Sequence, residues 1–275
     1  MSEKSEALPA SPETGRSKHA AFGSGALIGT LAGLIGLGGA EFRLPLLISL
    51  FRFQGLEAVI LNKATSLVVV ATALPFRAST VSFAEIGAQW PIIVNLLAGS
   101  LIGAWVGAEW ASRLKSETLY RVIAVLLVVI AAILLLAHDT ATSAPPFTNW
   151  IQVVAGILAG FITGVIASLL GVAGGEFLIP TLVLLFGADI KLAGSLSLAV
   201  SLPTMLVGFA RYSRDQSFGV LRRNGTFLLV MTAGSIVGTF IGGQLLGLVP
   251  TYILLPLLAA VLLIAAVKVW RHQPV

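Results

Sequence analysis

The sequence predicts an all-α polytopic membrane protein made of two homologous halves in inverted topology. Of the 275 residues, 57% are hydrophobic and 11% are charged, and the mean hydropathy is +0.97. Roughly eight to ten apolar segments follow one another along the chain, and most approach the ~20 residues that cross a bilayer as a helix. A repeat with one constant offset relates the first half of the chain to the second, which predicts the two homologous halves.

The charged residues exclude several classes of function. The 17 Lys and Arg outnumber the 12 Asp and Glu, but the basic residues gather in short loops and tails, as membrane topology signals do. The sequence has no cysteine, and His19, His138 and His272 lie at segment ends or in tails. We therefore expect no nucleic-acid partner, no metal site and no cofactor.

The repeat is clearest in a glycine-rich element that contains a glutamate and ends at a proline. Its two copies are Gly36-Leu37-Gly38-Gly39-Ala40-Glu41-Phe42-Arg43-Leu44-Pro45 and Gly171-Val172-Ala173-Gly174-Gly175-Glu176-Phe177-Leu178-Ile179-Pro180. Each position of the first copy has its counterpart 135 residues later. The same offset relates further glycine pairs, among them Gly29 and Gly164, Gly99 and Gly234, Gly103 and Gly238, and Gly107 and Gly242. An internal duplication accounts for this pattern.

Each half is predicted to contain five helices, of which the second is short. In the first half we expect helices at about 19–36, 40–51, 57–76, 90–110 and 118–137, with a loop to Gln89 before the fourth. In the second half we expect them at about 150–171, 175–186, 190–209, 226–246 and 252–270, with a basic loop at 211–223. The segments after the glycines span only about 18 Å as helices, less than the bilayer core of about 30 Å.

The chain divides into a disordered cytoplasmic tail at 1–18, a first transmembrane repeat at 19–137, a linker at 138–149 and a second repeat at 150–271. The tail is polar and has no apolar core of its own. With both termini in the cytoplasm, the Lys and Arg of the loops fall on the cytoplasmic side, with Arg77 as the exception. This arrangement requires an odd number of crossings per half, which inverts the second half relative to the first.

The two broken segments form the predicted site. Proline lacks an N–H, so the carbonyls of Glu41 and Glu176, four residues before the prolines, lose their helical partner. The start of each short helix presents unpaired N–H groups and the positive end of a dipole, and two such ends that meet would suit a small anion. The candidate substrate-binding residues here are Gly38, Gly39, Ala40, Glu41, Arg43, Gly174, Gly175 and Glu176, and the helix-breaking positions are Gly36, Pro45, Gly171 and Pro180.

The side chains of Glu41 and Glu176 have two interpretations, which the sequence leaves open. A carboxylate in the first turn of a helix commonly does no more than satisfy the helix dipole. Alternatively, the two residues are candidate groups for proton coupling or for a cation. A charge buried at mid-bilayer costs at least about 2.5–3.5 kcal/mol, so we expect a cavity or a basic partner. Arg43 is such a partner, but its counterpart is Leu178, so the site is not symmetric.

Polar residues follow each break on the next helix. Asn62, Thr65, Ser66 and Ser195 are candidates to line the substrate path, although such side chains also serve helix–helix hydrogen bonds. Lys63 is expected near a membrane face, where its ammonium group can snorkel to the interface. The glycine stripes at 99–107 and 234–242 indicate close helix packing, within the chain or in a homodimer.

The paired Gly-x-Gly-Gly-Gly-x-x-x-x-Pro element, the glycine-rich first helix and the two similar halves resemble the sulfite exporter TauE/SafE family of bacterial membrane permeases. The likeness covers the chain from about residue 20 onward. Ala40 replaces the third glycine in the first copy, and Ala173 replaces the second glycine in the other. The resemblance implies a multi-pass protein of the bacterial inner membrane that moves small sulfur-containing anions such as sulfite, sulfoacetate or other organosulfonates.

Secondary transport by alternating access is the favoured function, with export as the expected direction. The sequence contains neither the Gly-x-x-x-x-Gly-Lys-[Ser/Thr] loop of an ATP-hydrolysing protein nor the residue constellation of an intramembrane enzyme. Two alternatives are a proton- or cation-coupled transporter of another small solute and a non-transporting membrane subunit of a larger complex. The expected partners are a small anion and the lipid bilayer, while proton coupling and a homodimer are left open.

Overall fold

The described part of the chain consists of helices joined by short connections in the computed structural model. The structure describes residues 17–35, 39–77, 81–136, 149–213, 219–244 and 251–271. The predicted tail up to residue 16 and the predicted linker up to residue 148 lie outside these residues. Among the described residues, five helices are long and apolar enough to cross a membrane. The prediction of an all-α polytopic membrane protein is confirmed.

Twelve helices follow one another in the described ranges. The first half contains α1 (Lys18–Ile35), α2 (Ala40–Ser49), α3 (Gly55–Arg77), α4 (Phe83–Ala88), α5 (Trp90–Arg113) and α6 (Ser116–Leu136). The second half contains α7 (Asn149–Leu170), α8 (Gly175–Phe186), α9 (Ile190–Tyr212), α10 (Gly219–Arg223), α11 (Gly225–Gln244) and α12 (Thr251–Trp270). The ten predicted helices are all present, and the bounds of α8 agree with the prediction at both ends.

Two short helices lie where the sequence predicted loops. α4 occupies part of the predicted loop before Gln89, and that prediction is wrong because Ser82 caps a helix there: its side chain accepts a hydrogen bond of 3.2 Å from the backbone N–H of Glu85. Serine followed three residues later by glutamate is a sequence signal for a helix start. α10 lies within the predicted basic loop at 211–223.

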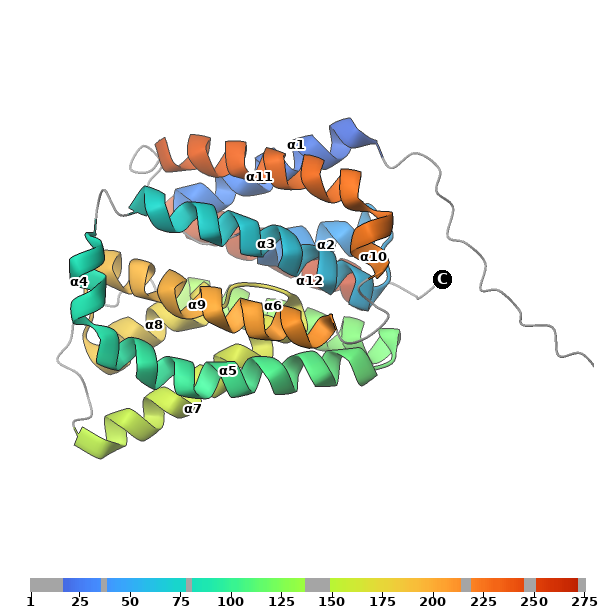
Figure 1. Cartoon of the computed structure of the whole chain (residues 1–275). Coiled ribbons are helices and arrows are strands. Elements are labelled where there is room, and N and C mark those ends of the chain that lie inside the picture. Colours follow the sequence, from blue (N-terminus) through green and yellow to red (C-terminus); the bar gives the residue numbers. More distant parts are fainter. Residues whose placement is uncertain are drawn as a thin grey trace, which may run out of the picture.

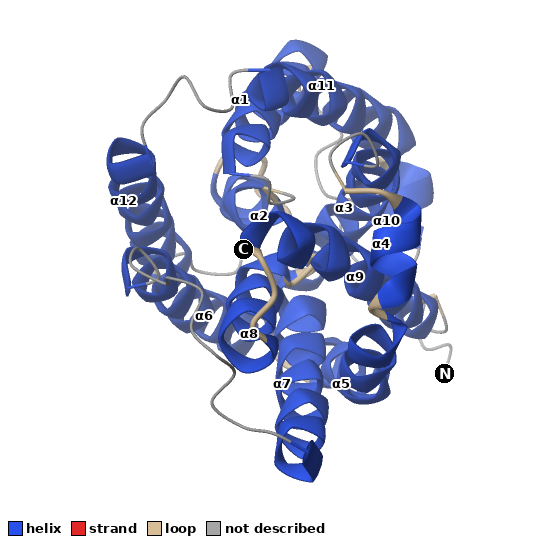
Figure 2. Ribbon diagram, turned by 90° about the vertical axis from the view of Figure 1, so that its left-hand side faces the viewer, coloured by secondary structure: helices blue, strands red, loops and turns tan. Residues whose placement is uncertain are grey.

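The short helices α2 and α8 lie at the centre of the bundle. Most of the longer helices lie side by side along one common axis (Figure 1). Viewed along the bundle, α2 and α8 lie between the pair α6 and α12 on one side and the pair α3 and α9 on the other (Figure 2). α1 packs against α11, and α5 packs against α7. Protein therefore surrounds the two short helices.

The glycine stripes allow two of the helix pairs that join the halves, α1 with α11 and α5 with α7, to pack closely. A methyl group on Gly29 of α1 would overlap the carbonyl oxygen of Ser235 on α11, and one on Gly164 of α7 would overlap that of Ser100 on α5. The two contacts are equivalent, because the glycines are 135 positions apart and so are their partners. Three more contacts have an equivalent at the same offset: Gly25–Met231 matches Gly160–Leu96, Gly99–Ile157 matches Gly234–Phe22, and Gly103–Phe161 matches Gly238–Ala26. Matched contacts of this kind are expected when an approximate twofold axis relates two repeats. Because these glycines are used inside the molecule, they give no reason to expect a homodimer.

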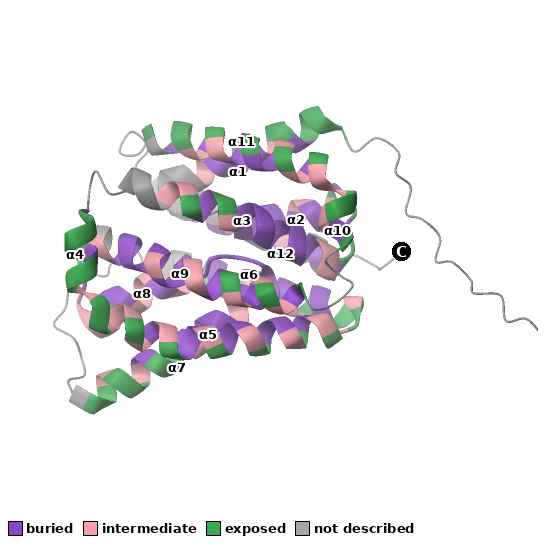
Figure 3. Ribbon diagram, in the orientation of Figure 1, coloured by how far each residue is buried: buried purple, intermediate pink, exposed green. Residues whose placement is uncertain are grey.

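The burial pattern places polar groups inside and apolar groups outside. Large apolar side chains such as Ile102, Leu229 and Phe240 are more than half exposed on the outer helix faces (Figure 3). The buried polar side chains lie mainly on α2, α3, α7, α8 and α9. A soluble protein rarely exposes apolar surface so widely, whereas a bilayer covers it and leaves the interior for the polar groups.

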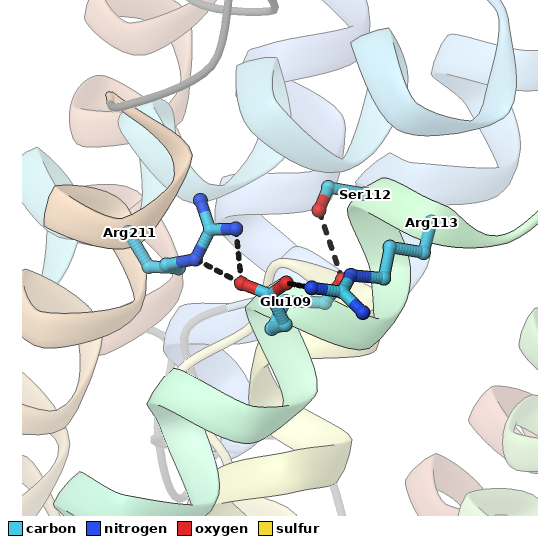
Figure 4. Close-up of polar contacts among 4 residues, drawn as sticks. All are labelled: Glu109, Ser112, Arg113 and Arg211. Atoms are coloured by element: carbon cyan, nitrogen blue, oxygen red, sulfur yellow. Dashed lines mark hydrogen bonds and ion pairs between the residues drawn. The ribbon is translucent and has the colours of Figure 1, made fainter.

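Two ion pairs link the halves at the end of the bundle where α3 begins and α5 and α9 end (Figure 1). The carboxylate of Glu109 on α5 pairs with Arg211 on α9 and with Arg113 on its own helix (Figure 4). Glu57 on α3 pairs with Arg223 on α10 at 3.2 Å. Partly exposed ion pairs contribute only about 0–1 kcal/mol each, so these charges make a small contribution to the association of the halves.

The glycine contacts predict that alanine substitution destabilises the protein at one position on α1 and not at another. In Gly29→Ala the methyl group forces α1 and α11 apart, and overpacking of this kind costs about 1–3 kcal/mol. We expect a lower thermal unfolding midpoint for the purified protein in detergent. Gly23→Ala is the matched control on the same helix, because the space around Gly23 is open. Equal midpoints for the two variants would contradict the close approach.

Candidate functional site: the paired helix breaks

The short helices α2 and α8 each begin directly after a glycine in the left-handed conformation. Gly39 has a φ of 62° and Gly174 a φ of 82°, which glycine adopts without steric strain. Neither helix start has a side-chain cap, so no capping side chain accepts from the first N–H groups of either helix, although the N–H of Phe177 donates to the carbonyl of Gly174 at 3.1 Å. The prediction of short helices after glycine breaks is confirmed, while Gly36 and Gly38 lie outside the described residues.

The second break also depends on Gly171, which follows the end of α7. Its φ is 66°, and a side chain there would overlap the carbonyl oxygen of Val59 on α3. The break is thus packed directly against a helix of the first half. Pro45 lies within α2 and Pro180 within α8, as predicted. That the carbonyls of Glu41 and Glu176 bind a ligand stays a prediction.

Glu41 and Glu176 bring two carboxyl groups together inside the bundle. The two side chains come from the first turns of α2 and α8, and their residues are only 1% and 4% exposed. The carboxyl group of Glu41 interacts electrostatically with that of Glu176 and, to a smaller extent, with Arg43. Both carboxyl oxygens of Glu41 and one of Glu176 lack a hydrogen-bond partner among the described residues. Both glutamates lie in the first turn of a short helix, so the dipole interpretation and the proton or cation interpretation both stay predictions.

Arg43 is fully buried and uses only one side of its guanidinium group. Its Nη1 donates to the Oγ of Ser66 at 3.0 Å and to the Oδ1 of Asn62 at 3.4 Å. Its Nε and Nη2 have no hydrogen-bond partner in the described part of the chain. These two nitrogens form one edge of the planar fork that binds two oxygens of an anion. Glu41 accepts no hydrogen bond from Arg43, although the two charges interact electrostatically, so Arg43 retains donors for another partner.

Asn62 joins the two breaks. Its Nδ2 donates to the carbonyl oxygen of Ala40 at 2.9 Å and to that of Leu170 at 3.1 Å. Ala40 is the first residue of α2 and Leu170 the last of α7. The carboxamide of Asn62 therefore binds backbone carbonyls at both breaks, while its oxygen accepts a hydrogen bond from Arg43. Asn62 and Ser66, both predicted site residues, lie together at the centre of the site.

The other predicted polar residues are buried but differ in their contacts. Thr65 donates to the carbonyl of Leu61 on its own helix at 3.0 Å, which fits the packing interpretation. Ser195 is fully buried on α9. Gly175 begins α8 and is buried as well. Ser201, which the sequence did not single out, donates to the carbonyl of Ala173 at 2.7 Å and so ties α9 to the second break.

Lys63 lies inside the bundle, and the prediction that it snorkels to a membrane face is wrong. Its residue is 0% exposed, and its Nζ donates to the Oγ of Ser168 on α7 at 3.1 Å. α3 begins at Gly55, so Lys63 lies about 12 Å along the helix, and its side chain points towards α7 and α9. Helix position alone could not reveal this, because the direction of the side chain depends on how α3 packs.

The arrangement predicts that Asn62 protects both breaks from opening. Asn62→Leu leaves the carbonyls of Ala40 and Leu170 without their partner, a loss of about 1–3 kcal/mol for a buried group. We expect faster hydrogen–deuterium exchange in peptides that cover 39–45 and 171–176. The control is Asn95→Leu, which removes a bond of the same type, to the Val153 carbonyl at 3.1 Å, but away from the breaks. Unchanged exchange at the breaks in Asn62→Leu would contradict this role.

Comparison with known proteins agrees with this architecture. No solved structure matches the chain. A probable membrane transporter protein of Bacillus subtilis, YunE, is 24% identical over 203 residues, which cover 67% of this chain and 74% of the relative. The family described as sulfite exporter TauE/SafE matches residues 11–269. The chain therefore belongs to the sulfite exporter TauE/SafE family of membrane transporters.

Proposed function

We propose that the chain is a secondary transporter that exports small sulfur-containing anions, such as sulfite, sulfoacetate or other organosulfonates, by alternating access. The observation that carries the proposal is the group of buried, incompletely bonded charges where the two breaks meet. Five of the six buried side-chain atoms without a hydrogen-bond partner among the described residues belong to Glu41, Arg43 and Glu176. Unsatisfied buried polar atoms are rare in folded proteins and mark positions where a ligand completes the bonding.

Arg43 and the helix starts supply the anion site. The open Nε and Nη2 edge of Arg43 matches two oxygens of a sulfite or sulfonate group. The uncapped first turns of α2 and α8 add N–H donors and the positive ends of two helix dipoles. Arg43 is itself fixed by Ser66 and Asn62. A small oxyanion therefore finds donors from both halves in one place.

Glu41 and Glu176 supply the proton coupling. Two neighbouring buried carboxyl groups repel each other when both are ionised, so we propose that this pair takes up and releases the coupling proton. An anion beside them increases this repulsion, and its binding is therefore linked to protonation. The same pair favours the alternative function, transport of a cation or proton with another solute, because two carboxylates form a cation site when both are ionised.

Alternating access requires two halves that can exchange conformations around a central site. The matched glycine contacts support this, since both halves use equivalent residues. α1 and α7 run in opposite directions along the bundle in Figure 1, which supports the inverted topology. We propose that the protein lies in the bacterial inner membrane with both termini in the cytoplasm, which places the Glu109 and Arg211 ion pair on the cytoplasmic side.

Transport in proteoliposomes tests the proposal directly. We expect the wild-type protein to accelerate flux of labelled sulfite and of sulfoacetate over protein-free vesicles, but not flux of rubidium ions. Arg43→Lys removes the planar guanidinium fork while keeping a positive charge. We expect the sulfite concentration at half-maximal flux to rise about tenfold, since hydrogen bonds to charged groups contribute about 1.5–3 kcal/mol. If no sulfur anion moves under any ion gradient or membrane potential, the proposed substrate is wrong.

The glutamates separate anion transport from cation transport. If they carry the coupling proton, Glu41→Gln and Glu176→Gln mimic the protonated form, so sulfite still binds while a pH gradient no longer changes its flux. If they form a cation site, the same variants abolish transport altogether. Glu85→Gln on the exposed face of α4 is the matched control and should retain the wild-type response to pH. Sulfite flux with an unchanged pH response in both site variants would refute proton coupling through this pair.

A further inference from the structure

A groove of about 520 Å³ lies on the outer side of the bundle, between α6 and α12. The two helices pack side by side at one edge of the bundle (Figure 2). On α6 the groove is lined by one alanine and three valines between positions 124 and 129, and on α12 by Ala266, Val267 and Trp270. Arg271, which follows α12 directly, is the one charged residue among those that line it. This α6–α12 groove is therefore apolar along its length and basic at one end.

Small side chains form the floor of the α6–α12 groove, and valines form its walls. Ala124 and Ala266 are only 2% and 3% exposed, whereas Val125 and Val267 are each 52% exposed. The open side of the groove belongs to the apolar outer surface, which a bilayer covers. Acyl chains of lipids are therefore the molecules that reach it first.

The basic end of the groove lies at the level of the lipid head groups. The 20 residues of α12 extend about 30 Å, which is the thickness of the hydrocarbon core, so Arg271 comes at the edge of the membrane. Trp270 is 55% exposed, and tryptophan side chains are enriched at that level. Val267 lies about 6 Å deeper than Arg271 along the helix. A lipid whose head group is at Arg271 thus has its acyl chain beside the valines.

Three basic side chains surround this end of the groove. Arg271 lines the groove itself, and Lys268 lies three positions before it on the same helix face. Arg121 of α6 lies one turn before Val125, but its guanidinium group pairs with Glu117 at 2.5 Å. None of the ion pairs found among the described residues includes Lys268 or Arg271. Both side chains are exposed, so an anionic head group can reach them.

A phospholipid fits this groove better than a second copy of the chain does. Around a twofold axis along the membrane normal, two copies bring the same groove end together at one depth. Lys268 and Arg271 of one copy would then face those of the other, and Glu117 is already paired with Arg121. Basic residues in the last turn of a helix also interact with its dipole, but that interaction does not need an apolar groove beside them. An acyl chain with an anionic head group matches both features.

We propose that the α6–α12 groove binds an anionic phospholipid, with one acyl chain between the valines and the phosphate at Arg271 and Lys268. The planar guanidinium group of Arg271 suits two oxygens of a phosphate. The groove walls give no selectivity by themselves, because the surrounding lipid tails are equally apolar. The charges therefore decide which lipid stays, and an anionic head group is preferred over a zwitterionic one. This site does not depend on which solute the protein transports.

Quenching of tryptophan fluorescence by brominated lipids tests the proposal. The purified protein is reconstituted in vesicles of equal phosphatidylglycerol and phosphatidylcholine, in which the acyl chains of one lipid or of the other carry bromine. The quenching that disappears in Trp270→Phe reports the α6–α12 groove. We expect phosphatidylglycerol to be preferred there about fivefold or more, because each Lys or Arg near a membrane surface contributes about that factor for an anionic lipid.

Two variants separate the head group from the acyl chain. Arg271→Gln removes one cation from an exposed position, so the protein still folds, and the preference should fall about fivefold. Val128→Phe fills the groove and keeps the charges, and it should also weaken the preference, because the acyl chain no longer fits. Arg222→Gln on α10 is the matched control, since Arg222 is also exposed but does not line the groove. It should retain the wild-type preference.

The same measurements identify any other occupant. If Arg271→Gln or Val128→Phe retains the full preference, no phospholipid is seated in the groove and the proposal is wrong. Weak quenching of Trp270 by both brominated lipids would show that a second copy covers the groove. Loss of the preference when sodium phosphate replaces sodium chloride at constant ionic strength would assign the basic end to free phosphate. An unchanged preference in sodium phosphate supports the lipid.

Discussion

The ends of α2 and α8 lie inside an apolar bundle, and the rest of the structure encloses them. Lipid offers no hydrogen bonds to an interrupted backbone, so protein has to surround such ends. Asn62 does this most directly, since one carboxamide binds carbonyls at both breaks. The glycine contacts of α1 with α11 and of α5 with α7 let the outer helices approach closely enough to close the bundle around them.

Enclosure of the breaks also concentrates charge. Glu41, Glu176, Arg43 and Lys63 are all buried, and each would be costly on its own in a membrane interior. The hydrogen bonds present satisfy Asn62 and part of Arg43, but they leave one edge of the guanidinium and most of the carboxyl oxygens open. The fully bonded groups, such as Asn62, shape the site, and the groups with open positions are those that we propose bind the substrate.

The two halves are equivalent in their packing but not in their chemistry. Backbone contacts recur at a constant offset because the glycines that permit them were duplicated together. The charged residues did not follow: Arg43 corresponds to Leu178, and the buried cation facing α7 and α9 is Lys63 of the first half. A scaffold with matched halves can exchange two conformations of similar energy, while an asymmetric site can still favour one of them.

The sequence by itself determined the helical membrane class and the ten main helices, including the two short ones, because hydropathy, glycine and proline act locally. The constant offset of 135 residues indicated the duplication. The sequence also singled out Glu41, Arg43, Asn62, Ser66 and Glu176 as candidates, since polar residues beside a break are conspicuous in an apolar chain, and the structure shows that all five are buried. The prediction missed α4 although the Ser82 and Glu85 signal was present, and it misplaced Lys63. Only the tertiary structure decided that Glu41 meets Glu176 and that Lys63 meets Ser168. Those contacts join residues more than 100 positions apart, and they follow from how the two halves pack rather than from any local pattern.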